Sequence, residues 1–269
     1  MLNTTMRAAL FLLLIATSIL NGFTAEKLGP PLRQTHAHND YEHVHPLWDA
    51  LEQGFTSVEA DIYLVDGQLL VAHELKDVKP ERTLRKLYLQ PLRELIAKNH
   101  GSVYPNGARV TLLIDVKTEA EPTYAALKPV LKEFAGMLTR FSKSKIETNA
   151  ITVILSGNRP RETLLDEPDR LASYDGRLSD LSKGLPVSFM PLVSDSFAAA
   201  FPSAKSGRLS ASDRRAFENS IKQAHQEGRA IRFWATMDDR ATWKMLRDAG
   251  VDFINTDDLA GLAAFLRER

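Results

Sequence analysis

The chain has 269 residues, of which 44% are hydrophobic and 25% are charged, a composition that excludes general disorder and fits one large α/β domain. Its 34 basic and 34 acidic residues cancel, so no basic excess is available for non-specific nucleic-acid binding or for docking on anionic membranes. The absence of cysteine excludes disulfides, thiolate zinc sites and a cysteine nucleophile.

The N-terminal segment has the pattern of a signal peptide. Arg7 precedes an apolar run over residues 8–20, which is too short to span a bilayer comfortably. The small residue Ala25 follows this run, so we expect a signal peptide over residues 1–25 and one mature domain over 26–269. Such a protein is secreted or periplasmic and keeps no transmembrane segment after cleavage; an uncleaved N-terminal anchor is the alternative.

Short apolar, β-branched segments alternate with amphipathic ones along the rest of the chain. Strands are predicted at residues 32–36, 57–64, 69–72, 110–116, 151–155, 187–192, 230–235 and 253–255. Helices are predicted at residues 46–53, 91–100, 122–141, 211–227, 239–249 and 258–267. This alternation predicts βαβ units and a parallel sheet.

About eight such units predict a TIM (β/α)8 barrel with some distortion, because that fold typically takes ~250 residues. A doubly wound open sheet is the alternative, although no glycine-rich dinucleotide fingerprint follows the first predicted strand. Residues 157–186 have no regular pattern, and we expect a long loop near the active site there.

Functional groups in a barrel gather at the carboxyl ends of its strands, and the first polar group there is rich in histidine. His36 and His38, followed by Asn39, come directly after the first predicted strand. Residues two apart on an extended segment share one face, so both imidazoles are candidates for acid–base chemistry. Four of the seven histidines lie within residues 36–45, although a polar surface loop is the simpler alternative.

Two acids on the second predicted strand are candidate metal ligands. Glu59 and Asp61 are two residues apart, between the apolar residues Val58 and Ile62, so both carboxylates point the same way from a strand that is expected to be buried. Buried like charges repel and lose hydration. A bound divalent cation removes both penalties, and oxygen ligands suit Mg²⁺ or Ca²⁺. A solvent-facing edge strand is the alternative.

A histidine ends the next predicted strand. His73 follows the apolar residues 69–72, and Asp66-Gly67 before them predicts a tight turn and a hairpin. A lone histidine at a strand end is usually structural, so the case for a catalytic role of His73 depends on the groups around it.

Later strand ends add an acid, two bases and an aromatic residue. Asp115 follows an apolar strand and is a candidate third carboxylate of the cation site. Lys117, on the same face, is expected to neutralise phosphate oxygens, although an Asp–Lys pair at a barrel rim is also common. Arg159 is a second candidate for phosphate binding, and Trp234 either lines the pocket or packs in the core.

These motifs, taken together, resemble those of the PI-PLC-like phosphodiesterase superfamily, which includes glycerophosphodiester phosphodiesterases and sphingomyelinase D. A narrower resemblance is to the altered-inheritance-of-mitochondria protein six family. It is carried by His36-Ala-His-Asn-Asp-Tyr41, Ser57-Val-Glu-Ala-Asp61, Leu70-Val-Ala-His73 and Ser156-Gly-Asn-Arg-Pro160. It covers the chain from residue 33 to about residue 262.

The resemblance implies a metal-dependent phosphoric diester hydrolase of lipid metabolism. It implies that Glu59, Asp61 and Asp115 hold one divalent cation, and that His73 is the second histidine of an acid–base pair. The first histidine of that pair is either His36 or His38, and Asn39 matches the asparagine that follows it, which makes Asn39 a candidate for substrate binding. The implied substrate is a small-molecule or lipid phosphodiester, lipid-derived or glycerophosphodiester-like. The His-Arg-Gly and Glu-Asn motifs of glycerophosphodiesterases do not follow the first predicted strand, however.

Two other functions remain open from the sequence. A metallohydrolase of amidohydrolase or polymerase-and-histidinol-phosphatase type also begins with His-x-His, but it needs further histidine ligands at later strand ends. His100 and His225 lie instead in predicted helix ends. A secreted barrel that binds phosphorylated ligands without cleaving them is the second alternative.

Overall fold

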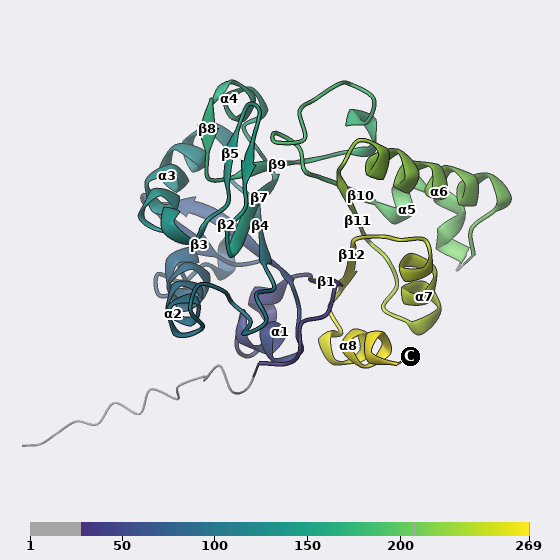
Figure 1. Cartoon of the computed structure of the whole chain (residues 1–269), viewed down its shortest axis with the longest axis horizontal. Coiled ribbons are helices and arrows are strands. Elements are labelled where there is room, and N and C mark those ends of the chain that lie inside the picture. Colours follow the sequence, from purple (N-terminus) through teal and green to yellow (C-terminus); the bar gives the residue numbers. More distant parts are fainter. Residues whose placement is uncertain (1–27, 207, 269) are drawn as a thin grey trace, which may run out of the picture.

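The computed structural model describes residues 28–206 and 208–268 (Figure 1). The predicted signal peptide lies outside these residues. Eight parallel strands form one sheet that closes on itself, because β1 pairs with β12 on one side and with β2 on the other. In their order around the barrel the strands are β1 (Gln34–Ala37), β2 (Ser57–Val65), β4 (Val110–Val116), β7 (Ile151–Gly157), β9 (Ser173–Gly176), β10 (Leu192–Ser196), β11 (Ala230–Trp234) and β12 (Phe253–Thr256). The predicted TIM barrel is therefore confirmed, and the open doubly wound sheet is excluded.

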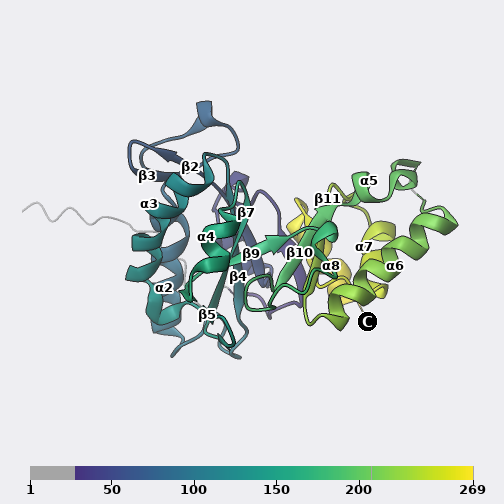
Figure 2. The same ribbon diagram turned by 90° about the horizontal axis from the view of Figure 1, so that it is seen from above.

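Helices surround this sheet. They are α1 (Trp48–Glu52), α2 (Gln90–Lys98), α3 (Ala120–Glu133), α4 (Arg161–Asp166), α5 (Phe197–Ala200), α6 (Ala211–Gln226), α7 (Arg240–Asp248) and α8 (Leu259–Arg267). Figure 2 shows α2 and α3 on one side of the molecule and α6 and α7 on the other. Short polar side chains begin the last three helices: Ser210, Asp239 and Asp258 accept hydrogen bonds from backbone N–H groups of the first turn.

Smaller elements decorate the barrel. The turn at Asp66-Gly67 has positive φ at both residues and joins β2 to the antiparallel strand β3 (Gln68–Val71), which confirms the predicted hairpin. A separate three-stranded sheet contains β5 (Arg140–Ser142), β6 (Ile146–Glu147) and β8 (Asp169–Arg170). Single helical turns lie at Asp40–Glu42, Leu75–Asp77, Arg85–Leu89, Ala135–Met137, Leu178–Asp180 and Pro202–Ser206.

Three predicted elements were wrong. β9 lies inside residues 157–186, which were expected to be a loop, because its sequence Ser-Tyr-Asp-Gly carries no β-branched residue and takes its strand form from pairing with β7 and β10. The strand predicted at 187–192 is displaced to β10, since Pro191 lacks the N–H that a central strand needs. The helix predicted to reach residue 141 ends at Glu133.

The core has two parts. A large apolar cluster packs between the strands and the helices. A small one, formed by Leu113, Ile154 and Leu192, lies on the strand faces that point into the barrel. Leu113 is two residues before Asp115 on β4, so the apolar layer fills the barrel interior below the polar groups at its carboxyl end. No helix of the described part of the chain is both long and apolar enough to cross a bilayer.

Candidate active site

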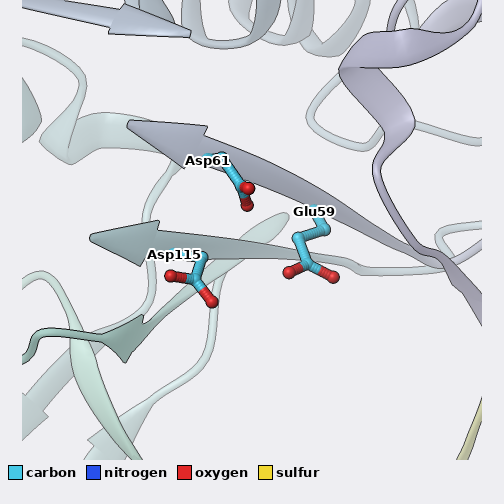
Figure 3. Close-up of side chains that lie close together, drawn as sticks. All are labelled: Glu59, Asp61 and Asp115. Atoms are coloured by element: carbon cyan, nitrogen blue, oxygen red, sulfur yellow. The ribbon is translucent and has the colours of Figure 1, made fainter. Parts of the chain in front are cut away.

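Three carboxylates meet at the carboxyl end of two neighbouring strands. Glu59 and Asp61 lie on β2, and strand register places Asp115 of β4 directly opposite Asp61. One oxygen from each carboxylate lies within 4.8 Å of the others, and Figure 3 shows the three side chains on the same side of the two strands. The residues expected to hold a cation therefore lie together; their role as ligands stays a prediction.

Lys117 partly balances the charge of this cluster. Its Nζ lies 3.0 Å from Asp61 Oδ2 and 3.2 Å from Asp115 Oδ1. Although partial burial opposes the ammonium charge, Asp115 and Asp61 raise the pKa of Lys117 above its usual value. The lysine thus binds two of the carboxylates directly. It also lies at the mouth of the barrel, that is, at the carboxyl end of its strands, where a phosphate was expected to bind.

Asp61 has an oxygen with no protein partner. Its side chain is 1% exposed, and its Oδ2 accepts hydrogen bonds from Lys117 and from the Tyr41 hydroxyl, the latter at 2.6 Å. Its buried Oδ1 has no hydrogen-bond partner among the described residues. Burial, followed by the charge of Glu59, raises the pKa of Asp61 to about 7. A cation would relieve both penalties.

Glu59 is held by an arginine that the sequence analysis did not identify. Arg232 Nη1, from β11 on the far side of the barrel, donates to Glu59 Oε2 at 3.1 Å. Although burial acts in the opposite direction, the charge of Arg232 keeps the pKa of Glu59 below its usual value. The available signal was a charged residue two positions before Trp234 on an apolar strand, where alternation points both side chains inward.

His36 is completely enclosed. Its Nδ1 lies 2.7 Å from Ser57 Oγ, and its Nε2 lies 3.0 Å from Glu59 Oε2 and 2.5 Å from Arg232 Nη1. Burial and then the Arg232 charge lower the pKa of His36 to about 4. A guanidinium only donates, so the neutral ring accepts from Arg232 at Nε2 and donates to Ser57 from Nδ1.

His38 has a different environment, two residues further along the same face. Its side chain is 29% exposed, and its Nδ1 lies 2.8 Å from Asp257 Oδ1. Although burial opposes it, the hydrogen bond with Asp257 raises the pKa of His38 above its usual value. Its Nε2 has no hydrogen-bond partner in the described part of the chain. The next residue, Asp258, caps the last helix by accepting from Gly261 N.

His73 lies beside the mouth without joining the cluster. It follows β3, its side chain is 53% exposed, and its Nδ1 is 3.4 Å from Glu74. The hydroxyl of Tyr63, two residues beyond Asp61 on β2, donates to the His73 carbonyl at 2.9 Å. This contact ties the His73 segment to the mouth, and the catalytic role of His73 stays a prediction.

The other candidates for substrate binding separate into two groups. The first group, Trp234 and Asn39, lies at the barrel interior. The ring of Trp234 is 4.9 Å from the guanidinium carbon of Arg177. The Oδ1 of Asn39 accepts a hydrogen bond of 2.7 Å from the hydroxyl of Tyr41, beside Asp61. Arg159 instead donates to Gly157 O and stacks on Tyr174 at 4.6 Å, in the outer core. The structure therefore does not bring Arg159 to the carboxylates.

A second buried polar group lies on β7 and β9, the next two strands around the barrel after β4. Asp175 is fully buried and accepts hydrogen bonds from Ser156 Oγ at 2.8 Å and from Arg177 Nη1 at 3.0 Å. Asp175 and Arg177 were not predicted as interior residues, because residues 157–186 were expected to be a loop.

Comparison with known proteins gives consistent results. The sequence profile of the AIM6-like phosphodiesterase domain matches residues 30–175, and that of the glycerophosphoryl diester phosphodiesterase family matches residues 230–260. The altered inheritance of mitochondria protein 6 homolog of Arthroderma benhamiae is 29% identical over 254 residues, which cover 83% of this chain and 81% of the relative. Altered inheritance of mitochondria protein 6 of Eremothecium gossypii is 29% identical over 272 residues, covering 88% and 70% of the two chains.

Solved structures with a similar fold include two glycerophosphodiester phosphodiesterases. The one from Parabacteroides distasonis has a TM-score of 0.55 and 16% sequence identity, and the match covers 90% of this chain and 99% of that structure. The one from Agrobacterium tumefaciens has a TM-score of 0.51 and 16% identity, covering 87% and 100%. At this identity the likeness shows a common fold.

Proposed function

Because the chain belongs to the AIM6-like phosphodiesterase domain family, we propose that it is a metal-dependent phosphoric diester hydrolase. We propose a lipid-derived or glycerophosphodiester-like phosphodiester as its substrate. The observation that carries the proposal is the buried carboxylate cluster of Glu59, Asp61 and Asp115, in which the Asp61 Oδ1 has no partner.

The donor set fits one hard divalent cation. All three candidate ligands are carboxylates, and oxygen ligands suit Mg²⁺ or Ca²⁺. Lys117 and Arg232 offset part of the cluster's negative charge, but neither reaches the buried Oδ1 of Asp61. When bound, the cation would polarise a non-bridging phosphate oxygen and offset the charge that develops in the transition state.

We assign proton transfer to His38 rather than to His36. The ring of His38 is partly exposed, is oriented by Asp257 and has a free Nε2. Both nitrogens of His36 are occupied, and its lowered pKa makes its ring a weak proton acceptor. A histidine hydrogen-bonded to a carboxylate through one nitrogen can accept or donate a proton through the other.

His73 is proposed as the partner of His38, on the strength of its place in the Leu70–His73 motif and its position beside the mouth. One imidazole removes the proton of the attacking water or substrate hydroxyl, which forms the new P–O bond. The other imidazole protonates the leaving oxygen as the old P–O bond breaks. Each such proton transfer contributes typically ~10²–10⁴-fold to the rate.

The contacts of Lys117 indicate a double role. Its ammonium group holds Asp61 and Asp115 in place, and its remaining exposed surface faces the mouth, where it would offset the charge of a bound phosphodiester. Trp234 and Asn39 are proposed to line the same opening. Arg159 is not included, because it stacks on Tyr174 in the outer core.

The histidine-rich metallohydrolase has less support. The metal-binding cluster found among the described residues contains carboxylates alone. His100 and His225 lie away from the strand ends, and His225 pairs with Asp252.

The test is a panel of phosphodiesters assayed with Mg²⁺ and with Ca²⁺. Hydrolysis that needs the added cation and is lost in Asp61→Asn supports the proposal. Asp248→Asn is the matched control, because Asp248 is an exposed aspartate of α7 that pairs with Lys244. Binding of phosphodiesters without cation-dependent turnover of any of them would instead favour a non-catalytic barrel.

We also propose that the protein is secreted or periplasmic. The proposal is supported by the basic and apolar segment over residues 1–25, which ends in small residues. N-terminal sequencing of the exported protein tests it: a mature chain that begins near residue 26 is the expected result, and an intact N-terminus on an exported, membrane-attached chain contradicts it.

A further inference from the structure

The polar interior of the barrel is organised around Arg232. This residue lies on β11, opposite the carboxylate cluster, and its side chain is 3% exposed. A buried guanidinium carries a large desolvation cost unless its N–H groups and its charge are matched by partners. The partners of Arg232 therefore indicate its role.

Four strands contribute acceptors to this one side chain. Nη1 donates to Glu59 Oε2 on β2 and to Asn255 Oδ1 on β12, both at 3.1 Å, and it also contacts His36 Nε2 on β1. Nε lies 3.4 Å from Ser194 Oγ on β10. The planar fork is thus fixed from several sides of the barrel, and the carboxylate that it binds is fixed with it.

The contact uses one oxygen of Glu59 and leaves the other available. Oε2 is bonded to Arg232, whereas Oε1 makes no hydrogen bond within the described part of the chain. The Glu59 carboxylate lies on the same side of the strands as those of Asp61 and Asp115 (Figure 3). A glutamate has three side-chain torsions, so without such a restraint its carboxylate would sample several positions.

We infer that Arg232 is a positioning residue for the cation site: it holds Oε2 of Glu59 so that the other oxygen is presented, in a fixed place, to the metal. The inference rests on the proposed cation-dependent function. His36 completes the restraint, because its neutral ring is anchored on Ser57 and accepts from the same Nη1. Arg232 acts through Glu59.

Lysine is not an equivalent of this arginine. An ammonium group is a single point of charge at the end of a flexible chain, whereas the guanidinium reaches Ser194 with Nε and Glu59 with Nη1 at the same time. Arg232→Lys therefore keeps the buried positive charge and removes the fixed geometry. Comparing Arg232→Met with Arg232→Lys therefore distinguishes the contribution of the buried positive charge from that of the fixed guanidinium geometry.

The test measures cation affinity without turnover. Mn²⁺, a cation that suits carboxylate ligands, is titrated into the purified protein, and free Mn²⁺ is followed by electron paramagnetic resonance. Loss of a group that orients a metal ligand typically costs ~10–100-fold in metal affinity, and we expect a loss of this size in Arg232→Met and a smaller one in Arg232→Lys. Arg177→Met is the matched control: it removes a neighbouring interior guanidinium that binds Asp175 instead of the cluster, and we expect its Mn²⁺ affinity to be unchanged.

The outcomes are distinct. If the wild type binds Mn²⁺ and both Arg232 variants bind it equally well, the inference is wrong while the proposed function stands. If the wild type binds no Mn²⁺, the proposed cation site fails and the inference fails with it. Circular dichroism checks folding; should Arg232→Met not fold, Arg232→Lys decides alone, and wild-type affinity in that variant overturns the inference.

Discussion

Protons should compete with the cation at Asp61. With no cation bound, burial and the charge of Glu59 raise the pKa of Asp61 to about 7, so this carboxyl group is largely protonated below that pH. A cation binds the ionised form. Cation binding must therefore release a proton at low pH, and the dissociation constant must rise as the pH falls below about 7.

The size of the effect follows from that pKa. A single competing proton weakens binding about tenfold for each pH unit below the pKa, so relative to pH 8 the dissociation constant should be roughly tenfold higher at pH 6 and roughly a hundredfold higher at pH 5. Burial also raises the pKa of Asp115, which can only steepen the dependence.

Isothermal titration calorimetry in buffers of different ionisation enthalpy counts the protons released. We expect about one proton per cation at pH 6 and almost none at pH 8, from the occupancy of a group that titrates near pH 7. The Asp61→Asn variant cannot take up this proton. We therefore expect it to bind the cation more weakly than the wild type and with a smaller dependence on pH. A dissociation constant that stays constant from pH 5 to pH 8 with no proton release would refute the reasoning.

Three further predictions concern single residues. His38→Ala should lower kcat by ~10²–10⁴-fold with the fold intact; Asp257→Asn should cost less and move the pKa of His38 downward in the pH profile, and an unchanged profile would contradict the pairing. His73→Ala should lower kcat by a similar ~10²–10⁴-fold, so wild-type turnover by this variant would remove His73 from the mechanism. Gly157→Ala should destabilise the fold by ~1–3 kcal/mol in a denaturant titration and weaken cation binding. The reason is that φ of Gly157 is +65° and the new Cβ would lie 2.1 Å from Asp115 Oδ1 and 2.5 Å from the Val116 carbonyl oxygen. Normal stability and normal cation affinity would show that this part of the site can move.

The barrel and its carboxylates could be predicted because two local patterns are strong. On β2 two acids spaced two apart lie between apolar residues, and on β4 an apolar run leads to a single acid. Periodicity therefore gives both the strands and the face on which Glu59, Asp61 and Asp115 lie. β9 has no such pattern: its inward residue Asp175 is polar, and its strand form depends on two neighbours that are distant in sequence. Pairing of this kind cannot be read from a short window.

How deep a given side chain lies inside the barrel could not be predicted from the sequence either. Alternation points both His36 and His38 inward, and the sequence alone could not choose between them. The register of β1 with β12 places His36 opposite Asn255, one layer deeper, where Arg232 and Glu59 enclose it. Arg232 was missed for the same reason, since its partners come from four other parts of the chain.

The apolar layer of Leu113, Ile154 and Leu192 fills the barrel interior below the carboxylates, so a cation would reach the site from the carboxyl end of the strands. Under the proposed function, a phosphodiester bound at that end would lie between the cation and the solvent. Binding would then be ordered, with the cation entering first and leaving last. A chelator should strip the cation more slowly from protein saturated with a non-hydrolysable phosphodiester, and equal stripping rates would point to a second route to the metal.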